Sequence, residues 1–97
     1  MPTYVWLGRW TDQGIRNVKD TLTLTEQANA AIEKAGGRTV GVWWTHGAYD
    51  IVTVTEFPDD EAGSAFVLAA AMGGNVRIET MRAYTEEEIQ RIIQKLP

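Results

Sequence analysis

The chain has 97 residues, a formal net charge of −4 and 44% hydrophobic residues. This length suits one domain, so we assign residues 1–97 to a single unit. The acidic balance argues against nucleic-acid binding, which needs a basic surface, and no apolar run approaches a membrane span. The absence of cysteine excludes disulfides, thiolate nucleophiles and sulfur-bound metals. Because no signal peptide is recognisable, we expect a cytoplasmic protein.

Hydrophobic periodicity predicts four strands and three helices. The expected strands span residues 3–10, 38–46, 51–55 and 75–84, and the expected helices span about 23–35, 59–73 and 85–96. The order is β-α-β-β-α-β with an added C-terminal helix. This order predicts an α+β, ferredoxin-like fold, in which one antiparallel four-stranded sheet carries two helices on one face. We expect residues 11–20 to form a polar loop.

Local signals mark the helix ends. Thr23 with Glu26, and Thr85 with Glu88, have the capping-box form, in which each side chain bonds the backbone N–H of the other residue. Gly-Gly pairs follow the first and second helices and stop them. The apolar stripe of the first helix is rich in alanine, so we expect this helix to pack close to the sheet.

The sheet face without helices carries an unusual set of side chains. In the predicted alternation it holds Tyr4, Trp6, Trp10, Trp43, Thr45, Ile51, Thr53, Thr55, Arg77, Glu79 and Met81. Tryptophans gathered on an exposed face indicate a partner, and we expect a homodimer or higher oligomer. The polar groups equally suit a small-molecule pocket, with Trp6, Trp10, Trp43, Thr45, Arg77, Glu79 and Met81 as candidate ligand-binding residues. Both interpretations stay open.

The hairpin between the second and third strands concentrates the candidate chemistry. His46 and Asp50 have the residue types of an acid–base pair, because a carboxylate fixes the tautomer of an imidazole. Tyr49 has the type that donates to a developing oxyanion. The alternative is structural: Asp50 accepts backbone N–H bonds, Tyr49 packs over the sheet and His46 is solvated. A single histidine offers too few ligands for a first-row metal, so we predict no metal and no cofactor.

Arg77 and Glu79 stand two residues apart on the fourth strand, so both point to the same face. Arg77 suits a carboxylate or phosphate on a ligand. The alternative is a cross-strand or intersubunit salt bridge, since buried charges rarely go unpaired.

Three stretches share a pattern with a known family. They are Thr11-Asp12-Gln13-Gly14 with Arg16, Thr45-His46-Gly47-Ala48-Tyr49-Asp50, and the run from Gly74-Asn75-Val76-Arg77 through Glu79-Thr80 to Ala83-Tyr84-Thr85-Glu86-Glu87. Over essentially its whole length the chain resembles the GYD family, small bacterial and archaeal proteins without an established general function. The resemblance implies a ferredoxin-like fold of the dimeric α/β-barrel type, with two sheets face to face. It implies no chemistry, and His46 stands at a position expected to vary.

We therefore expect a homo-oligomeric small-molecule-binding or accessory protein. Its ligand is expected to be small and aromatic or anionic, held in an aromatic-lined pocket on the open sheet face. The alternative is a cofactor-independent enzyme of the oxygenase or isomerase type, with His46, Tyr49 and Asp50 as catalytic residues. A purely structural oligomer is the third possibility.

Overall fold

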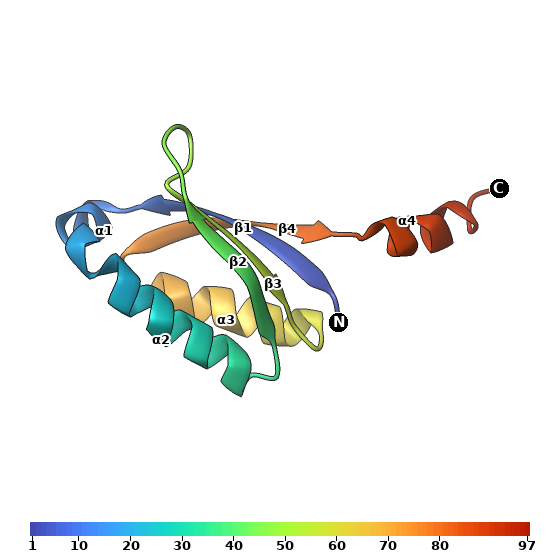
Figure 1. Ribbon diagram of the computed structural model, residues 1–97, viewed down its shortest axis with the longest axis horizontal. Coiled ribbons are helices and arrows are strands. Elements are labelled where there is room, and N and C mark those ends of the chain that lie inside the picture. The colour runs from blue at the N-terminus through green and yellow to red at the C-terminus, as the bar shows by residue number, and fades with distance from the viewer.

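The computed structural model describes residues 1–97 as a single sheet with helices on one side (Figure 1). Its elements in chain order are β1 (Thr3–Trp10), α1 (Asp12–Arg16), η1 (Val18–Asp20), α2 (Thr21–Lys34), β2 (Arg38–Trp44), β3 (Ile51–Glu56), α3 (Asp60–Met72), β4 (Val76–Ala83) and α4 (Glu86–Ile93). The sheet order is β2-β3-β1-β4, and all three neighbouring pairs are antiparallel. The α+β, ferredoxin-like prediction is confirmed. None of the helices combines the length and apolarity that crossing a membrane requires.

Residues 11–20 are more regular than the sequence predicts. Instead of a loop they form α1 and a 3₁₀ turn, η1, which runs directly into α2. Because helical turns already begin in η1, α2 starts before Thr23 and has Asp20 as its N-cap. The capping box predicted at Thr23 is therefore wrong. The second capping box, Thr85 with Glu88, is confirmed.

The alternation of β1 is opposite to the prediction. The residues that the sequence placed on the open face, but that point to the helices, are Tyr4, Trp6, Trp10, Ile51, Thr53 and Thr55. Residues paired directly across two strands point to the same face of the sheet. The β3 residues paired with β1 therefore face the helices together with their partners. Tyr4 and Trp6 are only 6% and 3% exposed, and α3 supplies that cover. Trp43, Arg77, Glu79 and Met81 lie on the open face, the face that α2 and α3 do not cover, as predicted.

The core is an aromatic cluster between the sheet and α3. Its buried hydrophobic members are Tyr4, Trp6, Phe57 and Ile32, and Phe66 of α3 packs against them. The ring of Trp6 meets Phe57 and Phe66 edge-on, with centroids 6.1 and 5.8 Å apart. Edge-to-face contacts of this kind add to the stability gained from buried area alone.

Two hydrogen bonds satisfy the polar atoms of this aromatic cluster. The indole N–H of Trp6 donates to Oγ1 of Thr55, a residue that is fully buried in β3. The hydroxyl of Tyr4 donates to Asp60 at the start of α3. Burial, followed by this bond to the carboxylate, raises the pKa of Tyr4 to about 12, so the hydroxyl stays neutral.

The Thr55→Val variant tests the bond to Trp6. It keeps the shape of the side chain but leaves a buried indole N–H without an acceptor, which should lower the free energy of unfolding by about 1–3 kcal/mol. Thr80→Val is the matched control. Thr80 of β4 lies directly opposite Trp6 of β1, yet it is exposed and its side chain forms no hydrogen bond. Its effect should stay within about 0.5 kcal/mol. Urea denaturation of the two variants measures the difference, and equal effects would contradict the assignment.

Candidate ligand-binding site

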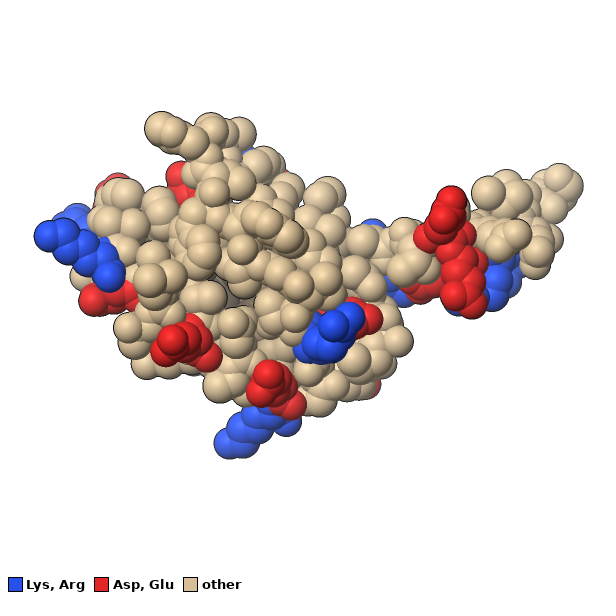
Figure 2. All heavy atoms as spheres, in the orientation of Figure 1, with Lys and Arg blue, Asp and Glu red and all other residues tan.

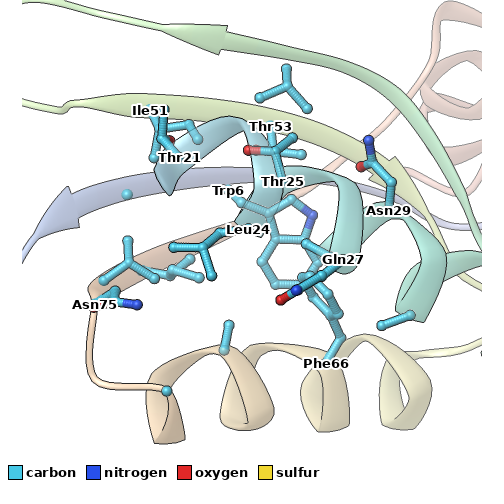
Figure 3. Close-up of a pocket in the computed structure, with 18 of the residues that line it drawn as sticks. Trp6, Thr21, Leu24, Thr25, Gln27, Asn29, Ile51, Thr53, Phe66 and Asn75 are labelled. Carbon is cyan, nitrogen blue, oxygen red and sulfur yellow. The ribbon is translucent and has the colours of Figure 1, made fainter. Parts of the chain in front are cut away.

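A cavity of about 400 Å³ lies between the sheet and helices α2 and α3. Figure 3 shows Trp6, Leu24, Ile51 and Phe66 around it, drawn from two strands and both helices. The volume falls within the range of ligand pockets, about 300–1,000 Å³. No aspartate, glutamate, lysine, arginine or histidine lines the cavity. In Figure 2 a hollow opens in the middle of a face whose charged side chains lie mainly around the margin. This cavity lies on the helix side of the sheet, and the pocket expected on the open face stays a prediction.

Small side chains keep the cavity open. Ala28 and Ala31 of α2 and Ala69 and Ala70 of α3 all line it. The alanine-rich stripe of α2 lines the cavity at Ala28 and Ala31, whereas the larger Ile32 packs into the core. Such a space between packed elements is uncommon in protein interiors, which are normally filled to crystal-like density.

The floor of the cavity requires a glycine. A methyl group added at Gly8 would lie 2.6 Å from Cγ2 of Ile51 and 3.0 Å from Cγ2 of Val76. All three residues line the cavity. Because both neighbours are β-branched and stiff, they cannot easily make room for a side chain on β1. Gly8 therefore keeps the floor flat where the strands cross beneath the helices.

Several polar groups around the cavity are free to bind a ligand. The side chains of Thr25, Gln27 and Thr53 line it and form no hydrogen bond within the chain. Others are already engaged: Oγ1 of Thr21 accepts from the indole of Trp44 at 3.0 Å, and Asn29 accepts from Thr39 at 2.9 Å. The site thus offers an apolar chamber with two hydroxyls and one amide, and no charge.

A latch, formed by Thr11 and Gln13 at the start of α1, joins this helix to the segment before β4. The Thr11 hydroxyl donates to the Gly74 carbonyl at 2.6 Å, and the Gln13 amide donates to Oδ1 of Asn75 at 2.9 Å. At Gly14 a Cβ would lie 1.9 Å from the Asn75 carbonyl oxygen, so no side chain fits there. Asn75 itself lines the cavity. The polar side chains of Thr11 and Gln13 therefore fix α1 against the residues that precede β4.

The hairpin residues are engaged in bracing the sheet. Asp50 accepts from the backbone N–H of Trp10 at 2.9 Å, and its own N–H donates to the Gly8 carbonyl at 2.8 Å. These bonds support the structural alternative for Asp50. His46 is exposed and forms neither a hydrogen bond nor an ion pair. No acid–base pair between His46 and Asp50 is present in this structure.

Tyr49 belongs to a second brace on the open face. Its hydroxyl donates to Glu79 at 2.8 Å, and the Arg9 guanidinium lies 4.4 Å from the centre of its ring. Arg9 also pairs with Glu79 at 3.1 Å and donates to the Ala48 carbonyl at 2.9 Å. The bond to Glu79 raises the pKa of Tyr49, and the same bond, followed by the one from Arg9, lowers the pKa of Glu79. The sequence contains Arg9 but gives no signal for its part in this brace.

Apart from the exposed His46, the predicted site residues divide into three groups. Trp6 and Trp10 line the cavity. Thr45, Tyr49, Asp50 and Glu79 take part in the bracing of the hairpin. Trp43, Met81 and Arg77 are exposed on the open face, where Arg77 forms no ion pair and Glu79 pairs with Arg9 instead. No three His, Cys, Asp or Glu side chains come together in a way that holds a metal ion.

Comparison with known protein families tests the resemblance to the GYD family. The sequence matches the family described as the GYD domain over residues 4–93. The chain belongs to the GYD domain family. A search of curated proteins found no match to it. In this GYD domain, two stretches of the family pattern have a structural explanation: Thr11–Gly14 forms the latch, and Tyr49-Asp50 braces the hairpin on β1 and β4.

The Tyr49→Phe variant tests the hairpin brace of this GYD domain. Losing the hydroxyl should raise the pKa of Glu79 toward its ordinary value, although Arg9 still holds it partly down. A carboxyl whose pKa is lowered by folding stabilises the fold above its unfolded pKa of about 4.3, and this contribution is lost as the pH falls through the folded pKa. The variant should therefore lose less stability on acidification than the wild type does.

An NMR titration of the Glu79 carboxyl carbon measures this change directly. His46→Ala is the control in the same hairpin, since His46 forms no hydrogen bond or ion pair, and it should leave the Glu79 titration unchanged. An unchanged Glu79 pKa in the Tyr49→Phe variant would refute the brace.

Proposed function

We propose that this GYD domain binds a small, uncharged and largely apolar molecule in the cavity between the sheet and helices α2 and α3. One observation carries the proposal: a chamber of about 400 Å³ is held open by alanines and a glycine, and no charged side chain lines it. Taking an ion out of water into such a chamber costs several kcal/mol when no opposite charge meets it. A neutral ligand avoids that cost.

The shape of the ligand follows from the walls. Trp6 is fixed at its indole nitrogen by Thr55, and Phe66 meets its ring edge-on. A planar aromatic ring or a flat polycyclic skeleton suits walls of this kind. The hydroxyls of Thr25 and Thr53 and the amide of Gln27 favour a ligand with one or two carbonyl or hydroxyl groups.

Three further expectations accompany this proposal. Self-association through the open face is supported by its exposed apolar residues, including Trp43 and Met81. Catalysis by His46, Tyr49 and Asp50 stays a prediction without geometric support, since none of the three lines the cavity. The cytoplasmic location also stays a prediction.

A matched pair of fluorescent probes tests the preference for neutral ligands. Phenylnaphthylamine is uncharged, and anilinonaphthalene sulfonate has the same skeleton with an added sulfonate. The neutral probe should bind at least about tenfold more tightly, a difference of roughly 1.4 kcal/mol. Tighter binding of the anionic probe would contradict the proposal.

Filling the cavity tests where the probe binds. Ala28→Phe places a ring inside the chamber, and Ala30→Phe places the same ring on the exposed side of the same helix. Ala28→Phe should weaken phenylnaphthylamine binding at least about tenfold, whereas Ala30→Phe should leave it unchanged. Ala69→Phe on α3 repeats the test if the first variant loses helix content by circular dichroism. Equal binding to all three folded variants would place the probe elsewhere and overturn the proposal.

A further inference from the structure

The C-terminal arm, residues 84–97, leaves the body of the protein. Figure 1 shows α4 beyond the end of the sheet, apart from the other helices. The radius of gyration is 14.6 Å and the longest extent is 51 Å. A compact domain of this length has a radius of gyration of about 12.5 Å. The arm is therefore an extension that its own chain does not cover.

Helix α4 has an apolar face without a partner. Ile89, Ile93 and Leu96 are 41%, 58% and 65% exposed, and they recur at helical spacing. The helix has only 8 residues, and isolated helices shorter than about 12 residues are marginal in water. Its capping box stabilises the first turn but covers none of the apolar face. A helix of this kind depends on packing against another surface.

Arg82 fixes the direction in which the arm leaves. Its guanidinium lies 4.5 Å from the centre of the Tyr84 ring and pairs with Glu88 of α4 at 3.4 Å. The same side chain donates to the Thr3 carbonyl of β1, so it ties the arm to the sheet. These contacts tie the start of α4 to the sheet, and Ile89 and Ile93 stay exposed on the helix.

The surface area of the chain indicates that something covers it. The accessible surface is 6715 Å², and only 8 of 97 residues are buried. A folded monomer of this size exposes about 5,500 Å². The excess is of the order of the roughly 800 Å² that each partner buries in a stable complex. The chain therefore exposes enough additional surface for one standard interface.

The open face supplies only part of such an interface. Its apolar centre is made by Val5, Leu7, Val52 and Val54, which lie on adjacent strands. The rest of this face carries charged side chains, among them Arg9, Arg77 and Glu79, so only its centre is apolar. The exposed isoleucines of α4 supply additional apolar surface on the same molecule.

The charges around this surface favour a second copy in the opposite orientation. Arg77 is exposed on the open face at the start of β4 and forms no ion pair. The arm leaves from the other end of β4, and Glu86 and Glu87 lie in the first turn of α4, where Glu87 pairs with Arg91 at 3.3 Å. Figure 2 shows acidic side chains on the arm with basic ones beside them. When two copies pack with their β4 strands antiparallel, Glu86, which forms no ion pair within its own chain, lies toward the Arg77 end of the other copy. Opposite charges placed in this way orient an interface.

We propose that α4 of each chain crosses to a second copy of the protein and packs its isoleucine face against that copy. The proposal rests on the self-association proposed above and adds the element that completes the interface. The two arms are exchanged around a two-fold axis, as isologous dimers require. Each arm then lies at the end of the partner that carries the hairpin and α1, where Trp43 and Ile15 are exposed.

A lysine placed on either side of α4 tests the contact. Ile93→Lys puts the charge on the apolar face, and Gln90→Lys puts the same charge on an exposed position outside the isoleucine stripe. Sedimentation velocity over a range of concentrations measures the dimer dissociation constant. We expect Ile93→Lys to raise it at least about tenfold and Gln90→Lys to leave it unchanged, with circular dichroism spectra of the folded body alike. An unchanged constant in Ile93→Lys overturns the arm exchange while leaving self-association intact, and a monomeric wild type overturns both.

Cross-linking identifies the surface that the arm contacts. The chain has no cysteine, so Gln90→Cys carries a photoactivatable maleimide at a single position. Equal amounts of ¹⁴N- and ¹⁵N-labelled chains are mixed, irradiated and digested. We expect cross-linked peptides that join light to heavy chains, from the arm to the end with the hairpin and α1. Cross-links confined to single chains would overturn the proposal.

Discussion

The burial of one indole N–H organises this structure. Trp6 stands in the middle of β1, and its ring is too large to be covered on the open face of a single sheet. Its buried nitrogen needs an acceptor, and the hydroxyl of Thr55 on the neighbouring strand provides one. With Trp6 on the helix side, α3 closes over it through Phe66, while the alanines of both helices leave the space beside the ring unfilled. The cavity is a consequence of that arrangement.

The sequence predicts the elements of this GYD domain well and their faces poorly. Strand alternation shows which residues share a face but not which face meets the helices, and β1 has large apolar residues on both sides. The extra residue Val40 between Thr39 and Gly41 also changes the phase of β2 along its length, which no local pattern marks. The helix side of β1 is decided by the hydrogen bond to Thr55 and the packing of Phe57, contacts 49 residues or more along the chain.

In the candidate site, too, the sequence predicts some features and not others. Asp50 was correctly given a structural alternative, because a carboxylate at a turn commonly accepts backbone N–H bonds, and it does so from Trp10. The brace that joins Tyr49, Glu79 and Arg9 combines residues of three segments, so the sequence order hides it. The sequence does not indicate the cavity on the helix side, since an alanine-rich stripe is typical of close packing, and only the three-dimensional structure shows that Ala28 and Ala31 line an unfilled space beside the buried Ile32.

We thus propose separate roles for the two sides of the sheet: the helix side binds a neutral ligand, and the open face with the arm contacts a second copy. Our central claim is that the chamber beside Trp6 is an unfilled, apolar space. Apolar cavities bind xenon, which fills them without hydrogen bonds. Diffraction from a crystal pressurised with xenon therefore tests the claim most directly. The account predicts xenon density between Trp6, Phe66 and the alanines of α2 and α3. Helices packed directly onto the sheet, with no xenon between them, would contradict it.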